Sequence, residues 1–165
     1  SIPTATIPGG HMLKTRIIPC LDVKDGRVVG RGHTAPGGRP HAEPQALAQA
    51  GDAARGATAY VTLEPCSHHG QTPPCTDALI AAGVARVVAA VEDSDPRVSG
   101  AGFKALRDAG IAVDLGVFAA EAAQDHAGFF LRQAEDRPWV TLKLASSFDG
   151  RIATARTRRR ARAHP

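Results

Sequence analysis

The sequence predicts a three-layer α/β sandwich with a mixed central sheet, and three observations support that fold class. Short apolar runs rich in β-branched residues alternate with helical stretches of about ten residues along most of the chain. An Asp-Gly pair at positions 25 and 26 lies between the first two apolar runs, which is typical of an antiparallel hairpin. With 165 residues and no internal repeat, the chain has the length of one domain of ordinary size, or of one domain plus a fragment.

The first half of the chain contains three of the expected strands and two of the expected helices. Residues 16–23 and 27–33 form the hairpin, and a loop rich in Pro and Gly follows it. Ala and Leu fill residues 41–54, which predicts a helix, and residues 58–63 form a short apolar strand. A second helix covers residues 75–82 and ends at the glycine that follows it.

The second half continues the same alternation. The expected strands cover residues 86–91, 111–117 and 139–144, and the expected helices cover residues 103–109 and 119–134. Gly110 ends the first of these helices. The apolar face of the second includes Phe129, Phe130 and Leu131.

Composition and charge narrow the functional classes. The chain is 43% hydrophobic, but its apolar runs are too short to span a bilayer, so no membrane association is expected. The formal net charge of +4 depends on arginines near the C-terminal end of the sequence, which are Arg156, Arg158, Arg159, Arg160 and Arg162. This run has no aromatic residue to stack a base, which disfavours nucleic acid as a partner. Three cysteines argue for reduced thiols in the cytoplasm, and Cys20 is expected to be a small buried residue.

A His-x-Glu motif and two Pro-Cys pairs carry the chemistry of the chain. The cysteines of the two pairs are Cys66 and Cys75. His41 and Glu43 lie roughly twenty residues before the first of these pairs, which is the layout of a zinc-dependent nucleobase deaminase. One imidazole and two thiolates bind the metal and leave the fourth tetrahedral position open for water, as in a catalytic zinc site. Zinc lowers the pKa of such a water from about 15.7 to about 7, and Glu43 can carry its proton to the ring and to the departing amine.

A structural zinc site is the alternative interpretation of the same residues, with His68 or His69 as the fourth ligand. Structural sites place paired cysteines about two to four residues apart, whereas eight residues separate Cys66 from Cys75. Glu43 would also have no purpose in such a site. We therefore favour the catalytic layout.

Three segments of the chain resemble the family of bifunctional riboflavin-biosynthesis deaminase/reductases. They are residues 66–77, which read Cys-Ser-His-His-Gly-Gln-Thr-Pro-Pro-Cys-Thr-Asp, residues 93–98, which read Asp-Ser-Asp-Pro-Arg-Val, and residues 137–153. The last segment is similar to the opening of the family's reductase domain, and the resemblance covers roughly residues 28–154. It implies an α/β/α sandwich of the cytidine deaminase-like type.

The resemblance also implies roles for particular residues and a substrate. His41, Cys66 and Cys75 would hold one zinc ion per chain, Glu43 would shuttle protons, and His68 and Asp93 would contact the phosphoribosyl part of the substrate. The substrate would be 2,5-diamino-6-(5-phosphoribosylamino)pyrimidin-4-one, which loses its 2-amino group as ammonia to give the corresponding uracil. No NADPH is expected, because the reductase-like part ends after roughly twenty residues.

The resemblance divides the chain into three parts. Residues 1–12 would be a leader or linker, residues 13–134 the zinc deaminase domain, and residues 135–165 the truncated start of a reductase domain with a basic, disordered tail. Within the deaminase domain, residues 13–29 instead resemble the start of the cyclase subunit of imidazole glycerol phosphate synthase, whose catalytic Asp matches Asp22. Because that enzyme is a barrel of about 250 residues, cyclase activity is excluded.

The replaced N-terminus removes two features of the deaminase family, the first helix and a Ser-Pro-Asn-Pro type of turn whose Asn contacts the substrate. We expect Asp22 to fall on a buried face and one face of the sheet to lack its helix, which would allow association into a homo-oligomer. Two smaller departures change the charge near the substrate. Gln71 stands where the family carries Lys or Arg, and Asp95 stands where it carries Asn.

Three hypotheses follow from the motif, the resemblance and these departures. The leading one is a zinc deaminase of riboflavin biosynthesis whose activity the replaced N-terminus could impair. A zinc-binding but inactive chimera is the second, favoured by the missing Asn turn. The third is another nucleobase deaminase that acts on a free base or an RNA base, for which the basic tail would be relevant.

Overall fold

A five-stranded mixed sheet forms the centre of the computed structural model, which describes residues 19–146, 148, 150 and 151. Its strands are β1 (Pro19–Lys24), β2 (Arg27–His33), β3 (Thr58–Leu63), β4 (Arg86–Val91) and β5 (Ala112–Leu115). They lie in the order β2-β1-β3-β4-β5, in which β1 is antiparallel to both of its neighbours and the last three strands are parallel. The predicted α/β class and the mixed sheet are confirmed.

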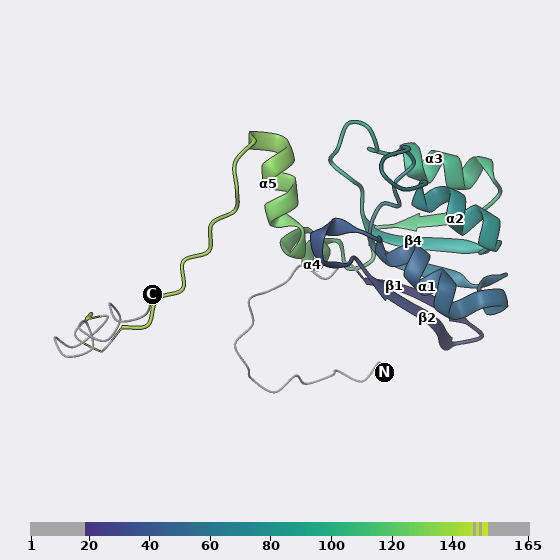
Figure 1. Ribbon diagram of the computed structural model, residues 1–165, viewed down its shortest axis with the longest axis horizontal. Helices are drawn as coiled ribbons and strands as arrows, with labels where there is room; N and C mark the ends of the chain where they lie inside the picture. The colour runs from purple at the N-terminus through teal and green to yellow at the C-terminus, as the bar shows by residue number, and fades with distance from the viewer. Residues whose placement is uncertain (1–18, 147, 149, 152–165) are drawn as a thin grey trace.

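Helices lie on both faces of the sheet and complete the three layers (Figure 1). They are α1 (Ala42–Ala50), α2 (Cys75–Ala82), α3 (Ala101–Asp108), α4 (Ala119–Asp125) and α5 (Ala127–Glu135), with short 3-10 turns η1 (Pro36–Gly38) and η2 (Gly51–Ala54) on either side of α1. Figure 1 shows α1, α2 and α3 along the same side of the sheet, where Val87 and Ala89 of β4 belong to the core. Helix α4 contacts β4 on the opposite face, where Val88 and Ala90 are buried.

The turn between β1 and β2 has the geometry that its sequence predicts. Asp25 and Gly26 form a two-residue loop, and their φ angles are 49° and 74°. A type I′ turn requires positive φ at both positions, which Asp and Gly tolerate better than most residues. The turn thereby sets the register in which Lys24 pairs with Arg27.

Helix α1 lies directly on the backbone of β2. A Cβ atom at Gly30 would collide with the carbonyl oxygen of Ala46, and one at Gly32 would collide with that of Ala42. Only glycine permits so close an approach. Because Ala42 begins the helix, this contact also fixes the position of His41, the residue that caps it.

The first strand carries an acidic residue into the core, as the sequence predicts. Cys20 and Asp22 are fully buried and pair with Gly32 and Gly30, so they lie on the face that α1 covers. The Cys20 thiol donates to Asp22 Oδ1 over 3.9 Å, whereas Asp22 Oδ2 has no hydrogen-bond partner in the described part of the chain. Burial raises the pKa of the Asp22 carboxyl to about 6. The ionised form of this residue is therefore unfavourable in the folded protein.

Asp22→Asn is expected to raise the free energy of unfolding at pH 7 by about 2 kcal/mol. The unfolded chain releases the Asp22 proton near pH 4, about two units below the folded one. Between these values the unfolded state binds fewer protons, so the stability of the unmodified protein falls as the pH rises from 4 to 6. Asn at position 22 cannot ionise, so the variant does not lose stability in this way. The difference in the free energy of unfolding between the two proteins should therefore vanish near pH 4.

Urea unfolding of both proteins between pH 4 and pH 7 measures this difference. Asp25→Asn, in the exposed hairpin turn, is the matched control and should keep the unmodified pH slope. A stabilisation by Asp22→Asn that is the same at every pH would contradict a buried charge as its cause.

The helix expected at residues 119–134 is interrupted, so that prediction is corrected. It consists of α4 and α5, and the break lies at His126, whose φ and ψ are −94° and 3°. The His126 side chain is fully buried, and its ring meets Phe130 edge-on with 5.9 Å between centroids. After this bend α5 extends away from the sheet (Figure 1), and none of its described side chains is buried.

The prediction of a strand at residues 139–144 is wrong. These residues have no regular secondary structure, and the side chains of Trp139, Val140, Leu142 and Leu144 are exposed. A strand needs a neighbour that pairs with its backbone groups, and the described residues place no strand beside this segment. An apolar alternation alone therefore does not make the element.

The face of the sheet opposite α1 is partly uncovered, as expected. Tyr60 of β3 pairs with Val88 on that face and is 40% exposed, and Phe118 beside α4 is 69% exposed.

Cys20 is buried, as expected, and burial raises the pKa of its thiol. The predicted leader and arginine run lie outside the described residues. Among the helices that are described, none combines the length and the apolar character needed to cross a membrane.

Candidate metal-binding catalytic site

Three separate segments bring the predicted metal ligands together. His41 caps the N-terminus of α1, Cys66 lies in the loop after β3, and Cys75 is the first residue of α2. Parallel strands place the loops that follow them at one edge of a sheet, and the Gly30 and Gly32 contacts hold α1 over the same edge. The ligand atoms of the three residues all lie within 4.8 Å of one another.

The geometry of this group fits a zinc ion. His41 Nδ1 lies 3.3 Å from Cys75 Sγ and 3.6 Å from Cys66 Sγ. Tetrahedral coordination with ordinary Zn–N and Zn–S bonds would place nitrogen and sulfur about 3.6 Å apart. The donor set is the one that zinc prefers, and three protein ligands leave one position open. These three residues could therefore hold a catalytic zinc.

The cysteines differ in their ease of ionisation. Hydrogen bonding from the Cys75 thiol, helped by His41, lowers the pKa of Cys66 to about 4 despite its burial. The backbone N–H of Cys75 also donates to Cys66 Sγ at 3.3 Å, because Cys75 begins a helix. The pKa of Cys75 is raised, first by its hydrogen bond to Cys66 and then by burial. One thiolate thus forms readily, and a divalent cation would stabilise the second.

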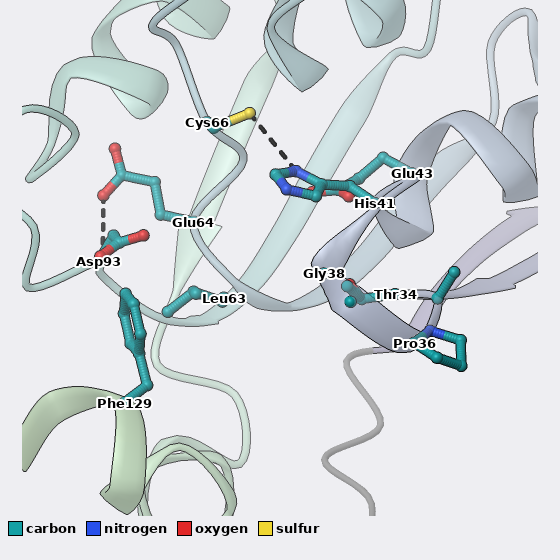
Figure 2. Close-up of a pocket in the computed structure, with 12 residues that line it drawn as sticks. Thr34, Pro36, Gly38, His41, Glu43, Leu63, Glu64, Cys66, Asp93 and Phe129 are labelled. Carbon is teal, nitrogen blue, oxygen red and sulfur yellow. Dashed lines mark hydrogen bonds between the residues drawn. The ribbon is translucent and has the colours of Figure 1, made fainter. Parts of the chain in front are cut away.

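Glu43 lies beside these ligands without joining them. It occupies the first turn of α1, is buried, and lines the same cavity as His41 and Cys66 (Figure 2). Burial raises the pKa of the Glu43 carboxyl. A carboxyl that releases its proton less readily than usual is suited to take up and return a proton at neutral pH.

The cavity in front of these residues has a volume of about 450 Å³. Figure 2 shows His41, Glu43 and Cys66 on one side of it and Leu63, Asp93 and Phe129 on another. Residues of η1 form a further wall. A cavity of this size, mostly apolar with a few convergent polar groups, can enclose a small ligand.

The two residues expected to contact substrate take different positions. Asp93 lines the cavity and is buried, and its carboxylate accepts a hydrogen bond from the Asp95 backbone N–H at 2.8 Å. His68 is half-buried in the loop between the two cysteines and is not among the residues that line the cavity. The structure therefore brings Asp93 into the cavity and leaves His68 outside its wall.

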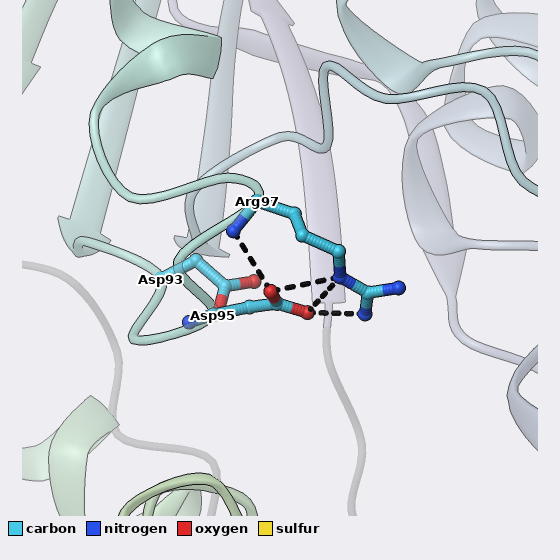
Figure 3. A network of polar contacts seen from close by, with 3 residues as sticks. All are labelled: Asp93, Asp95 and Arg97. Atoms are coloured by element: carbon cyan, nitrogen blue, oxygen red, sulfur yellow. Dashed lines mark hydrogen bonds and ion pairs between the residues drawn. The ribbon is translucent and has the colours of Figure 1, made fainter.

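The charge of Asp95 is compensated within its own loop (Figure 3). Arg97 donates through its backbone N–H and its Nε to Asp95 Oδ1, both at 2.9 Å, and pairs with Oδ2 as well. These bonds lower the pKa of Asp95 to about 2. The negative charge expected beside the substrate is thus balanced by a neighbouring guanidinium.

Glu64 is a site residue to which the sequence analysis assigns no role. Its buried carboxylate accepts backbone hydrogen bonds from Asp93 at 3.2 Å, Gly100 at 3.0 Å, Gly102 at 2.8 Å and Phe103 at 3.3 Å. Glu64 thereby fixes the loop that presents Asp93 to the cavity (Figure 2). Its bonds to Gly102 and Phe103 also fix the start of α3. The signal in the sequence is an acidic residue at the end of an apolar strand, directly before the Pro-Cys pair.

Glu64→Ala is expected to lower the free energy of unfolding by about 4 kcal/mol, because it leaves four backbone N–H groups without their acceptor. Urea unfolding measures the loss. Glu92→Ala is the matched control, since this exposed glutamate accepts only the Ser99 hydroxyl among the described hydrogen bonds. A loss below about 1 kcal/mol would show that water replaces the carboxylate.

The chain is similar to a deaminase family model and to riboflavin biosynthesis proteins. A family model described as the cytidine and deoxycytidylate deaminase zinc-binding region matches residues 12–91. The riboflavin biosynthesis protein RibD of Escherichia coli (strain K12) is 56% identical over 138 residues, which are 84% of this chain and 38% of that protein. RibD of Aquifex aeolicus is 53% identical over 145 residues, or 88% of this chain and 41% of that protein. The chain thus spans about two fifths of the length of these relatives.

Solved structures agree with this comparison. Acinetobacter baumannii RibD, form 1, is 49% identical, with a TM-score of 0.75 over 84% of this chain and 39% of that one. A diaminohydroxyphosphoribosylaminopyrimidine deaminase/5-amino-6-(5-phosphoribosylamino)uracil reductase from Thermotoga maritima is 43% identical, with a TM-score of 0.76 over 84% of this chain and 40% of that one. The expected cytidine deaminase-like sandwich is confirmed.

Proposed function

We propose that this chain, which has the cytidine deaminase-like fold, catalyses hydrolytic deamination of a pyrimidine in riboflavin biosynthesis. The observation that carries the proposal is the group of His41, Cys66 and Cys75 with buried Glu43 beside it at one cavity. A metal site with three ligands and an adjacent proton carrier is suited to attack of water on an aromatic carbon.

The residues divide the work between holding the metal and moving the proton. His41, Cys66 and Cys75 would hold a zinc ion, which when bound supplies a water acidic enough to act as a nucleophile at neutral pH. Glu43 would carry one proton of the attacking water to a ring nitrogen. It would carry the second proton, released when the new C–OH becomes a carbonyl, to the departing amine, which leaves as ammonia. Because Glu43 is buried, bulk water does not compete with its carboxyl in the transfer of these protons.

The substrate that we propose is 2,5-diamino-6-(5-phosphoribosylamino)pyrimidin-4-one, which loses its 2-amino group as ammonia. Asp93 and His68 are proposed to contact its phosphoribosyl part. Residues 13–134 would form the deaminase domain and residues 135–165 the start of a reductase domain with its basic tail. We propose a cytoplasmic location. We also propose that the protein forms a homo-oligomer, because part of the sheet face is apolar and exposed.

Ammonia release from this diaminopyrimidinone, measured on protein with quantified zinc, tests the proposal. Turnover with one zinc per chain is the expected result. Full zinc without turnover would instead favour the zinc-binding but inactive chimera, which is the second candidate function. The observation that favours it is the fully buried, partly unsatisfied Asp22 in the cyclase-like strand. Deamination of cytosine or an RNA base in place of this substrate would support the third hypothesis.

A further inference from the structure

Arg39 stands beside the cavity, between two residues that line it. Gly38 and His41 both belong to the cavity wall, and the Arg39 side chain extends from this segment to the loop between Cys66 and Cys75. There its Nη1 donates a hydrogen bond to the Thr72 hydroxyl. The guanidinium therefore bridges two of the segments that carry the metal ligands.

Arg39 and His68 converge on one point of this rim. A Cβ atom at Gly70 would lie 3.1 Å from Arg39 Nη2 and 3.9 Å from His68 Nε2, so both nitrogens approach the same point beside this glycine. His68 Nδ1, in contrast, is buried and has no hydrogen-bond partner among the described residues. Nε2 is thus the ring nitrogen on the side of Gly70 and Arg39.

In the described part of the chain, no acidic side chain forms an ion pair with Arg39. The ion pairs found among the described residues do not include Arg39, whereas Arg97 on the loop after β4 is held by Asp95. Gln71, exposed beside Gly70, is neutral. Because Arg39 is half-buried, its charge acts through a medium less polar than bulk water. This rim is accordingly suited to an anion.

We propose that Arg39, His68 Nε2 and the Thr72 hydroxyl form a phosphate subsite at the mouth of the cavity. The inference rests on the proposed function, in which the anion is the phosphate of the phosphoribosylamino group. A guanidinium binds two phosphate oxygens at once, and the Thr72 hydroxyl, which accepts from Arg39, can donate its own hydrogen to a third. The subsite anchors the substrate so that its ring reaches Glu43.

Arg39→Gln tests the subsite in turnover. We expect KM for the phosphorylated pyrimidine to rise at least about 10-fold with kcat within about 3-fold, while kcat/KM for the dephosphorylated nucleoside stays within about 3-fold. Arg39→Lys keeps the charge and should recover part of the lost affinity. Arg27→Gln, at the exposed start of β2, is the matched control. Equal losses for the phosphorylated and dephosphorylated substrates would overturn the proposal.

A binding measurement separates the subsite from the deaminase activity. Zinc-loaded protein is titrated with ribose 5-phosphate and with inorganic phosphate, followed by calorimetry, and folding of each variant is checked by circular dichroism. The expected result is a Kd for ribose 5-phosphate at least about 10-fold weaker in Arg39→Gln than in Arg27→Gln. This outcome would support the subsite even if no pyrimidine were deaminated. A Kd that differs less than about 2-fold between these variants would overturn it.

Discussion

Glu43→Ala is expected to lower kcat for ammonia release by about 10³–10⁴-fold while the chain keeps one zinc ion. The reason is the position of Glu43 beside the ligand group but outside it, buried in the first turn of α1. Removing the carboxylate takes away the group proposed to move protons and leaves the three proposed metal ligands in place. Single-turnover and steady-state kinetics, with zinc measured on the same sample, give both quantities.

Two further variants sharpen this test. Glu43→Gln has nearly the same shape but cannot accept the proton, so it should lose as much activity as Glu43→Ala. Glu121→Ala changes an exposed glutamate in the first turn of α4 and should leave kcat unchanged. Loss of zinc from Glu43→Ala would contradict the assigned role, because it would make Glu43 part of the metal site.

Helices and strands that are determined by residues close together in the sequence could be predicted from the sequence. The strands at Arg27–His33, Thr58–Leu63 and Arg86–Val91 and the helix at Cys75–Ala82 have the bounds that their sequences predict. Gly83 ends that helix with a φ of 71°, as a left-handed cap requires. In each case a turn residue or an apolar run carries the information within a few positions of the chain.

Elements that depend on distant contacts could not be predicted from the sequence. The bend between α4 and α5 depends on the burial of His126, and a polar residue at that position gives no sign of it. The apolar alternation after Arg137 resembles a strand, but pairing needs a neighbouring strand that the described residues do not supply. Both errors arise because burial and pairing are properties of the whole fold.

The candidate site also contains some residues that the sequence predicts and one, Glu64, that it does not. The His-x-Glu and Pro-Cys spacing predicts His41, Cys66 and Cys75 as one group, and the structure places their ligand atoms within 4.8 Å of one another. The positioning role of Glu64 could not be predicted, since its four backbone partners lie 29 to 39 residues further along the chain. Residue types and spacing predict groups that could bind a ligand directly, but they do not predict what holds those groups in place.

Cys66→Ala and Cys75→Ala are each expected to lose the zinc ion and to lower the free energy of unfolding by about 3 kcal/mol or more in the presence of zinc. The two thiolates come from the loop after β3 and from the start of α2, so a shared metal links two segments that are separate in the sequence. Without one sulfur, the remaining ligands bind zinc too weakly to maintain this link. Zinc content per chain and urea unfolding, with and without a chelator, measure both effects.

Cys20→Ala is the control that separates metal loss from packing loss. Cys20 is fully buried in β1 and lies outside the ligand group, so its variant should keep one zinc and lose only the packing of a small side chain. Chelation should destabilise the unmodified protein and Cys20→Ala by similar amounts, and should leave Cys66→Ala and Cys75→Ala almost unaffected. Stoichiometric zinc in either of the latter two would refute the ligand set, because a site with only two protein ligands would then suffice.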